Sequence, residues 1–328
     1  MNNIKLIASK SSEILYFTGG LVALPVSREE LVIGPMQVNP KDLFSGPLSF
    51  HDACGAAEEV GSYLVGVNRV HVMQSPERVE FWSPFPGFTG KSEKTADAWQ
   101  GVSFSARKAG DEVTAELATY LSFSLEFAGL RMREVCRLHN EQLRWALATP
   151  RESGKRFSNV AMFDLHLAIH SLVAELCAAR DYLATMAAIG VNARKGTDSL
   201  ARLCSWLKKE ANSEFRSDPF VNLLLTAAGT ETEPGWLTQL GEMRNRFMHR
   251  QPLAADHAST ALLFQTTATK VGELSTIQLA PFKRYSLEAP ADPGVTLLRF
   301  FQETGKLCTA AIAMAKYAPA FPVVNLDG

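Results

Sequence analysis

The sequence lacks a strong charge of either sign. Its 33 Lys and Arg residues are matched by 34 Asp and Glu residues, so the 328-residue chain has a formal net charge of −1. Proteins held on nucleic acid or on anionic membranes by overall attraction carry a large positive excess. We therefore expect no membrane partner, and any binding of RNA must come from a local group of basic residues.

The sequence also lacks a long apolar run and a cysteine framework. No stretch approaches the ~18 consecutive apolar residues of a transmembrane helix, and the first residues, MNNIKLIASKSSE, lack the apolar core of a signal peptide. The five cysteines are scattered, and none belongs to a C-x-x-C pair. These absences predict a cytoplasmic protein with reduced thiols.

Four familiar catalytic motifs are missing as well. The sequence has no phosphate-binding G-x-x-x-x-G-K-[ST] loop, no G-x-G-x-x-G after a strand, no H-E-x-x-H and no G-x-S-x-G. Their absence argues against the common nucleotide-cofactor, zinc-protease and serine-hydrolase sites. We expect no cofactor.

Glycine, proline and short apolar runs are concentrated in residues 1–110, which hold 11 of the 22 glycines and 7 of the 16 prolines. This texture is typical of strands and turns. Val70–Met73 and Val79–Trp82 form the clearest predicted β-hairpin, and one short helix is predicted over Asp52–Tyr63. The pattern predicts a small α+β module of unknown role over residues 1–110.

Residues 111–328 have a helical pattern instead. Residues 111–147 contain no proline and one glycine, and their apolar residues fall at helical spacing. A second long helix follows, with Ser158 as the expected N-cap and Gly190 as the expected C′ residue. Further helices are predicted over residues 199–211, 219–228, 234–249 and 295–317. The fold class is therefore mainly α, a C-terminal helical bundle with a smaller N-terminal α+β domain, and residues 251–293, with strand-like pieces such as TIQLAPF, form an insertion.

One segment near the end of a predicted helix carries a chemical pattern, Gly241-Glu-Met-Arg-Asn-Arg-Phe-Met-His-Arg250. Arg244 has no carboxylate at either four-residue neighbour and is left for a ligand, whereas Arg246 can pair with Glu242. Asn245 and His249 are four residues apart, so the Asn245 amide could hydrogen-bond the imidazole and fix its tautomer. The simpler interpretation is a solvated helix end whose basic residues complement the helix dipole.

Arginine and histidine together suit metal-free cleavage of RNA. The 2′-hydroxyl must lose a proton, the 5′-oxygen must gain one, and negative charge accumulates on the phosphoryl oxygens. A histidine can transfer the protons, and a guanidinium can donate two hydrogen bonds to the phosphate. Arg244 and His249 are, however, about 140° apart on an ideal helix. A two-fold dimer that brings two such helix ends together would solve this geometry.

The motif resembles the signature of the HEPN superfamily, helical nucleotide-binding domains in which arginine is followed by a polar residue and, a few positions later, by histidine. The context is similar too, because an earlier long helix contains Ala178-Ala-Arg-Asp-Tyr-Leu183. The resemblance covers residues 159–317 at most. It implies a metal-independent endoribonuclease that acts as a homodimer, with Arg244 and His249 catalytic and Asn245 supporting them.

The same resemblance implies a biological setting and an alternative. Such domains recur in toxin–antitoxin and antiviral defence systems, so an antitoxin or regulatory partner is possible alongside RNA. Some members of the superfamily only bind, and a non-catalytic nucleotide-binding, RNA-binding or scaffolding module is the alternative function. Residues 194–250 hold nine basic and seven acidic residues, which permits a local RNA groove without requiring one.

His166 and His170 form a second candidate constellation. They are four residues apart on the second long helix, and this spacing could present two ligands to zinc or another transition metal. No third ligand has suitable local spacing. We consider packing at the edge of the bundle the stronger interpretation, and a metalloprotein the further alternative.

Overall fold

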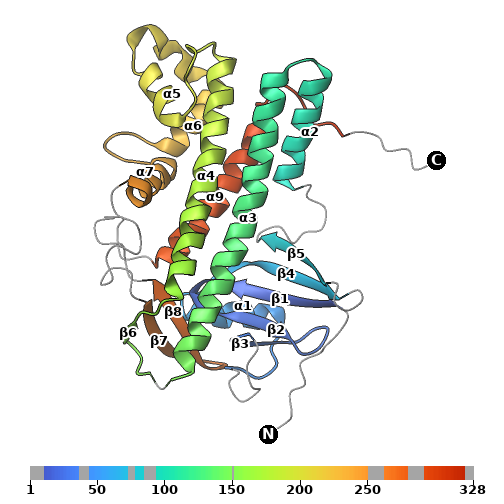
Figure 1. Ribbon diagram of the computed structural model, residues 1–328, viewed down its shortest axis with the longest axis vertical. Helices are drawn as coiled ribbons and strands as arrows, with labels where there is room; N and C mark the ends of the chain where they lie inside the picture. The colour runs from blue at the N-terminus through green and yellow to red at the C-terminus, as the bar shows by residue number, and fades with distance from the viewer. Residues whose placement is uncertain are drawn as a thin grey trace, which may run out of the picture. The chain divides into compact units, whose positions relative to one another are not determined.

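The computed structural model describes residues 11–36, 44–72, 78–84, 94–149, 151–249, 262–279 and 292–321 (Figure 1). Helix predominates among these residues, which confirms the prediction of a mainly α protein. The chain divides into two compact units, each assembled from separate stretches of sequence. Unit 1 takes residues 1–90, 129–169 and 251–298, and unit 2 takes residues 91–128, 170–250 and 299–328. This division differs from the single boundary expected at residue 110.

Unit 1 contains an antiparallel five-stranded sheet of order β3-β2-β1-β4-β5. The strands are β1 (Ser11–Phe17), β2 (Val22–Pro25), β3 (Leu31–Gly34), β4 (Leu64–Val72) and β5 (Arg78–Pro84). The predicted hairpin is confirmed as β4 and β5, in which Val70 lies opposite Glu80. Consecutive residues Leu15, Tyr16 and Phe17 are at most 3% exposed, so both faces of β1 are covered.

Helix α1 (Phe50–Glu59) of unit 1 confirms the short helix predicted over residues 52–63, with shifted ends. Ser49 caps it, because its hydroxyl accepts the backbone N–H of Asp52 at 3.1 Å. The 3₁₀ turn η1 (Thr18–Gly20) joins β1 to β2. Gly20 needs a φ of +81°, and a Cβ there would lie 2.8 Å from the carbonyl oxygen of His139, so only glycine fits.

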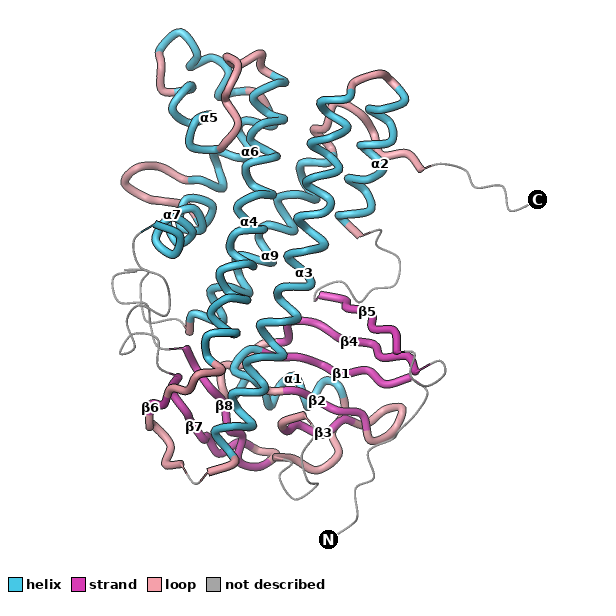
Figure 2. Tube along the Cα trace, in the orientation of Figure 1, coloured by secondary structure: helices cyan, strands magenta, loops and turns pink. Residues whose placement is uncertain are grey.

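A second, three-stranded sheet of unit 1 has the order β6-β7-β8 (Figure 2). Its strands are β6 (Arg156–Phe157), β7 (Leu262–Thr269) and β8 (Gly272–Leu279). The hairpin of β7 and β8 falls inside the predicted insertion, and Thr276–Leu279 of the TIQLAPF piece lies in β8. Residues 251–261 and 280–291 of that insertion lie outside the described residues.

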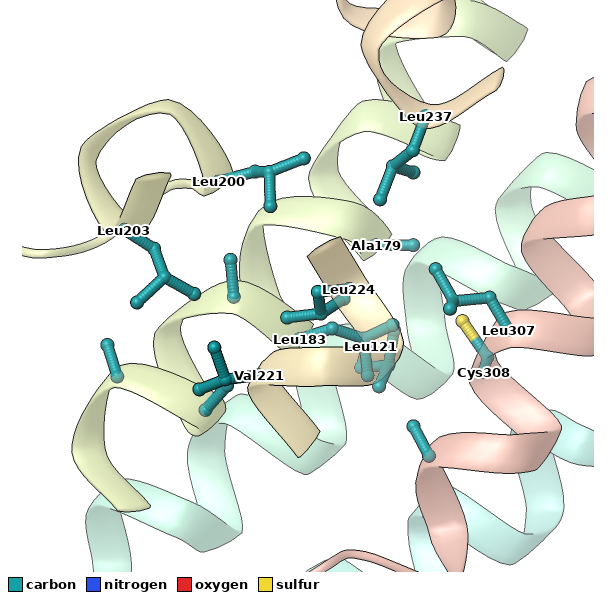
Figure 3. Close-up of a cluster of buried hydrophobic side chains, with 14 of the residues drawn as sticks. Leu121, Ala179, Leu183, Leu200, Leu203, Val221, Leu224, Leu237, Leu307 and Cys308 are labelled. Carbon is teal, nitrogen blue, oxygen red and sulfur yellow. The ribbon is translucent and has the colours of Figure 1, made fainter. Parts of the chain in front are cut away.

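Unit 2 is helical. It contains α2 (Thr95–Lys108), α5 (Leu200–Leu207), the 3₁₀ helix η3 (Glu210–Ser217), α6 (Pro219–Ala228) and α7 (Trp236–His249). It shares α3 (Glu112–Leu147), α4 (Met162–Gly190) and α9 (Pro293–Ile312) with unit 1. Leucines from six of these helices converge on one buried cluster, together with Val221 and Cys308 (Figure 3). Burial of this cluster supplies the main hydrophobic stabilisation of unit 2.

Helix α2 corrects the expectation that residues 1–110 hold one short helix among strands and turns. Its inward face is made of Ala96, Trp99, Val102 and Ala106, each at most 6% exposed. The spacing is helical, but alanine and glycine give it little apolar contrast. Gly101 lies against the chain after α9, where a Cβ would come within 3.0 Å of Pro319. This helix therefore depends on a segment more than 200 residues away.

The ends of several helices also differ from the predictions. Ser158 does not cap α4; the helix begins at Met162, whose N–H is accepted by the Asn159 side chain at 3.0 Å. Gly190 is the last helical residue rather than the C′ residue, and the left-handed conformation occurs at Asn192 (φ 52°). The helix predicted over residues 199–211 is divided into α5 and η3, and α9 ends at Ile312 rather than near residue 317.

Helix α4 is long and apolar enough to cross a membrane, with a mean hydropathy of 1.3 over its best window. About half of that window (56%) is buried within the protein. A helix at the core of a globular protein needs the same composition, so the composition of α4 does not distinguish the two settings.

The start of α3 is held by a polar network within unit 2. The carboxylate of Asp111 accepts the N–H of Thr114 at 3.1 Å and the Lys316 ammonium at 2.6 Å, and the Tyr317 hydroxyl donates to it at 3.1 Å. Chiefly through the Lys316 contact, these donors lower the pKa of Asp111 to about 2. The carboxylate is thus an N-cap and the anchor of the segment after α9.

We predict that Asp111→Ala lowers the free energy of unfolding by about 1–2 kcal/mol at pH 7, the usual cost of losing an N-cap. Because the folded-state pKa lies below the unfolded value, this contribution is complete above about pH 4 and disappears as the pH falls towards 2. Urea unfolding of both proteins at pH 7 and pH 3 measures the difference. An equal loss at both pH values would contradict the assigned role.

Candidate functional site on helix α7

Helix α7, orange in Figure 1, carries the three residues predicted to be catalytic. Its buried face consists of Leu237, Leu240, Gly241, Met243 and Phe247, and Leu237 points into the cluster of Figure 3. Arg244 is half-buried beside this face, whereas Asn245 and His249 are exposed. His249 is the last residue of the helix, and Arg250 lies outside the described residues.

Helix α7 contacts α4 at two places. The Cys177 thiol donates to the carbonyl of Leu240 at 3.8 Å. Seven residues further along α7, the ring of Phe247 stacks on His170, with centroids 5.0 Å apart and an interplanar angle of 3°. The two contacts join residues that are seven apart on each helix.

The surroundings of Arg244 agree with the prediction that it has no carboxylate partner. Its guanidinium Nη1 donates to Asn245 Oδ1 at 3.2 Å, and among the described residues it forms no ion pair. The charge of Arg244 contributes to lowering the pKa of the Cys177 thiol, although burial dominates and raises that pKa to about 11. Arg244 follows Leu240 by four residues and precedes Phe247 by three, and both of these residues contact α4, so Arg244 lies on the side of α7 that faces α4.

The structure does not form the expected hydrogen bond between Asn245 and His249. The Asn245 oxygen is occupied by Arg244, whose long side chain reaches its sequence neighbour. The His249 side chain has no hydrogen bond or ion pair among the described residues. Arg244 and His249 consequently lie on different sides of α7, as their separation of about 140° on an ideal helix requires.

The two histidines proposed as alternative metal ligands lie in unequal surroundings on α4. His166 is 5% exposed, while His170 is half-buried and stacked on Phe247. Burial lowers the pKa of His170 below its ordinary value, which favours the neutral ring. No group of three His, Cys, Asp or Glu side chains suited to a metal ion occurs among the residues that the structure describes. The packing interpretation of His170 fits these contacts.

Sequence reasoning missed Arg180, Asp181 and Gly241 as members of this site. Arg180 projects from α4 with its side chain 11% exposed and donates to the Asp181 carboxylate through Nε and Nη2, at 2.9 and 3.2 Å. The Asp181 carboxylate also accepts the N–H of Leu200 at the start of α5. The sequence contained one signal for this contact, the glycine Gly241 inside an amphipathic helix. A glycine at such a position often marks a place where another part of the chain lies close to the helix backbone.

Comparisons with known proteins add no relative: no protein-family model, no curated protein and no solved structure matches this chain.

The stack of His170 on Phe247 gives a prediction. We expect Phe247→Leu to raise the pKa of His170 towards its ordinary value, because the smaller side chain admits water to the ring. The same change should lower the free energy of unfolding by about 1–2 kcal/mol. NMR titration of the His170 ring and urea unfolding measure the two effects.

Met248→Leu is the matched control, because Met248 is the next residue and is 54% exposed. It should leave the pKa of His170 unchanged. Equal titration curves for His170 in the Phe247 variant and the native protein would show that Phe247 does not shield the ring.

Proposed function

We propose that the protein is a metal-independent endoribonuclease whose site is composed of Arg244 and His249 from two copies of the chain. The observation that carries the proposal is the state of Arg244: a half-buried guanidinium with no carboxylate partner among the described residues. An unpaired cation at a partly buried position favours binding of an anion. The resemblance of the surrounding motif to HEPN domains is the reason that we propose an RNA phosphate as this anion.

The proposed chemistry needs only the side chains of the motif. The ribose 2′-oxygen attacks the adjacent phosphorus, and the bond from phosphorus to the 5′-oxygen breaks. The 2′-hydroxyl loses its proton and the 5′-oxygen gains one, leaving a 2′,3′-cyclic phosphate and a 5′-hydroxyl. In this proposal His249 serves the proton transfer between these two oxygens, and Arg244 binds the phosphoryl oxygens. Asn245 orients the Arg244 guanidinium through the 3.2 Å hydrogen bond.

Two copies of α7 are needed because one copy presents the two groups in different directions. A two-fold axis near the end of α7 would place the exposed His249 of one copy opposite Arg244 of the other, and would create two equivalent sites. The exposed Met248, next to His249, provides apolar surface at this position. A toxin–antitoxin or antiviral setting remains part of the proposal through the HEPN resemblance alone.

The direct test is cleavage of end-labelled cellular RNA in EDTA by the native protein, Arg244→Ala, His249→Ala and Arg246→Ala. We expect the first two variants to lose at least ~100-fold in rate, since each removes a group that acts in the transition state. Arg246→Ala should remain near the native rate. Product ends with a 2′,3′-cyclic phosphate would confirm the reaction, and lack of cleavage by the native protein would favour the binding-module alternative.

Mixing the two inactive variants tests the composite site. In a random mixture of Arg244→Ala and His249→Ala chains, half of the dimers are mixed, and each mixed dimer has one intact site out of two. We therefore expect the mixture to recover about a quarter of the native rate after subunit exchange. A site contained within one chain would show no recovery.

A further inference from the structure

The guanidinium of Arg180 is only partly used by the protein. Its Nε and Nη2 atoms donate to Asp181, but Nη1 has no acceptor among the described residues. The side chain is 11% exposed, and Nη1 is not among the fully buried polar atoms that lack a hydrogen-bond partner, so solvent or a ligand can reach it. The remaining donor lies at the seam between α4 and α7.

Gly241 on α7 makes room for that donor. A Cβ built on Gly241 would lie 2.3 Å from Nη1 of Arg180, which is far inside van der Waals contact. Glycine in a helix interior costs about 1 kcal/mol relative to alanine. The missing side chain of Gly241 therefore leaves space for the Arg180 guanidinium, at a cost to the stability of α7.

Two guanidinium groups lie at this seam. Nη1 of Arg180 lies against Gly241, and Arg244 follows Gly241 by three residues, about one turn further on the same side of α7. The nearby carboxylate is Asp181, which pairs with Arg180 and also accepts the N–H of Leu200. Arg180 pairs with Asp181, whereas Arg244 forms no ion pair among the described residues, so the Arg244 charge is not neutralised there by a carboxylate in a region of reduced dielectric.

We propose that Arg180 and Arg244 form a two-arginine anion site at the seam of α4 and α7, and that its ligand is a phosphodiester group of RNA. Nη1 of Arg180 binds one phosphoryl oxygen while Arg244 binds another, and Gly241 positions Arg180. The identity of the ligand rests on the proposed function, whereas the anion site itself does not. Arg180 thus becomes a binding residue that the RNA-cleavage motif does not contain.

The test measures binding separately from cleavage. The probe is a fluorescein-labelled RNA oligonucleotide with 2′-O-methyl riboses, which cannot undergo attack by the 2′-oxygen. Its affinity is measured by fluorescence anisotropy over a series of salt concentrations. We expect Arg180→Gln to weaken binding about tenfold or more, the usual effect of losing a charge-assisted hydrogen bond. The slope of log affinity against log salt should fall by about 0.7, the value for one lost single-strand phosphate contact.

Matched variants separate binding from folding. Arg202→Gln is the control for Arg180→Gln, because Arg202 also pairs with an aspartate, Asp198, but its side chain is 62% exposed. Gly241→Ala should weaken binding like Arg180→Gln, whereas Gly305→Ala, on a helix where a Cβ meets nothing within 4 Å, should not. Circular dichroism and thermal unfolding confirm that each variant is folded.

Asp181→Asn provides the decisive contrast. If Arg180 binds an anion, removing the competing carboxylate tightens binding of the probe severalfold. If Arg180 and Asp181 only hold the helices together, both substitutions weaken binding. Weaker binding by the folded Asp181→Asn protein, native affinity in Arg180→Gln, or no binding by the native protein would each overturn the anion site. Arg180-dependent binding by a protein that cleaves no RNA would retain the site and reject the ribonuclease.

Discussion

The close approach of α7 to α4 determines where every residue of the candidate site lies. At Leu240 and Gly241 the two helices meet through a thiol-to-carbonyl contact and through the Arg180 side chain, which lies against the glycine. At Phe247 they meet again through a parallel ring stack. With these two points fixed, Arg244 must lie between them and face α4, and His249, two residues beyond the second point, must lie outside the contact.

The same seam explains how a buried guanidinium is tolerated. Removing a cation from water is costly, and Asp181 compensates Arg180 with two hydrogen bonds. The carboxylate also accepts the first N–H of α5, so it joins the arginine to the neighbouring helix. One carboxylate therefore serves a structural role and a charge-balancing role. It cannot satisfy all the donors around it, and this shortage leaves Nη1 of Arg180 available.

Periodicity predicted the long helices because their apolar residues repeat at 3.6-residue spacing over many turns. It failed for α2, where Ala96, Gly101 and Ala106 give little contrast and the covering segment lies after α9. In the site, counting neighbours four residues apart correctly left Arg244 without a carboxylate, but the same rule wrongly joined Asn245 to His249. That rule ignores contacts between adjacent residues. The contact between Arg180 and Gly241 joins residues that are 61 positions apart in the sequence. It arises only when α4 and α7 pack together, so local spacing could not predict it.

The nearly neutral net charge of the chain is compatible with an RNA site of this kind. Affinity that depends on many exposed lysines and arginines requires a basic protein, because each exposed contact is weak and screened by salt. Two guanidinium groups at a partly buried seam act in a lower effective dielectric, where each contact is stronger and less screened. The proposed site would therefore not require a basic chain, and the count of 33 basic and 34 acidic residues does not argue against it. If most of the binding free energy came from one phosphate, the proposed site would hold the RNA at a single position. It would not depend on extended contacts along the strand.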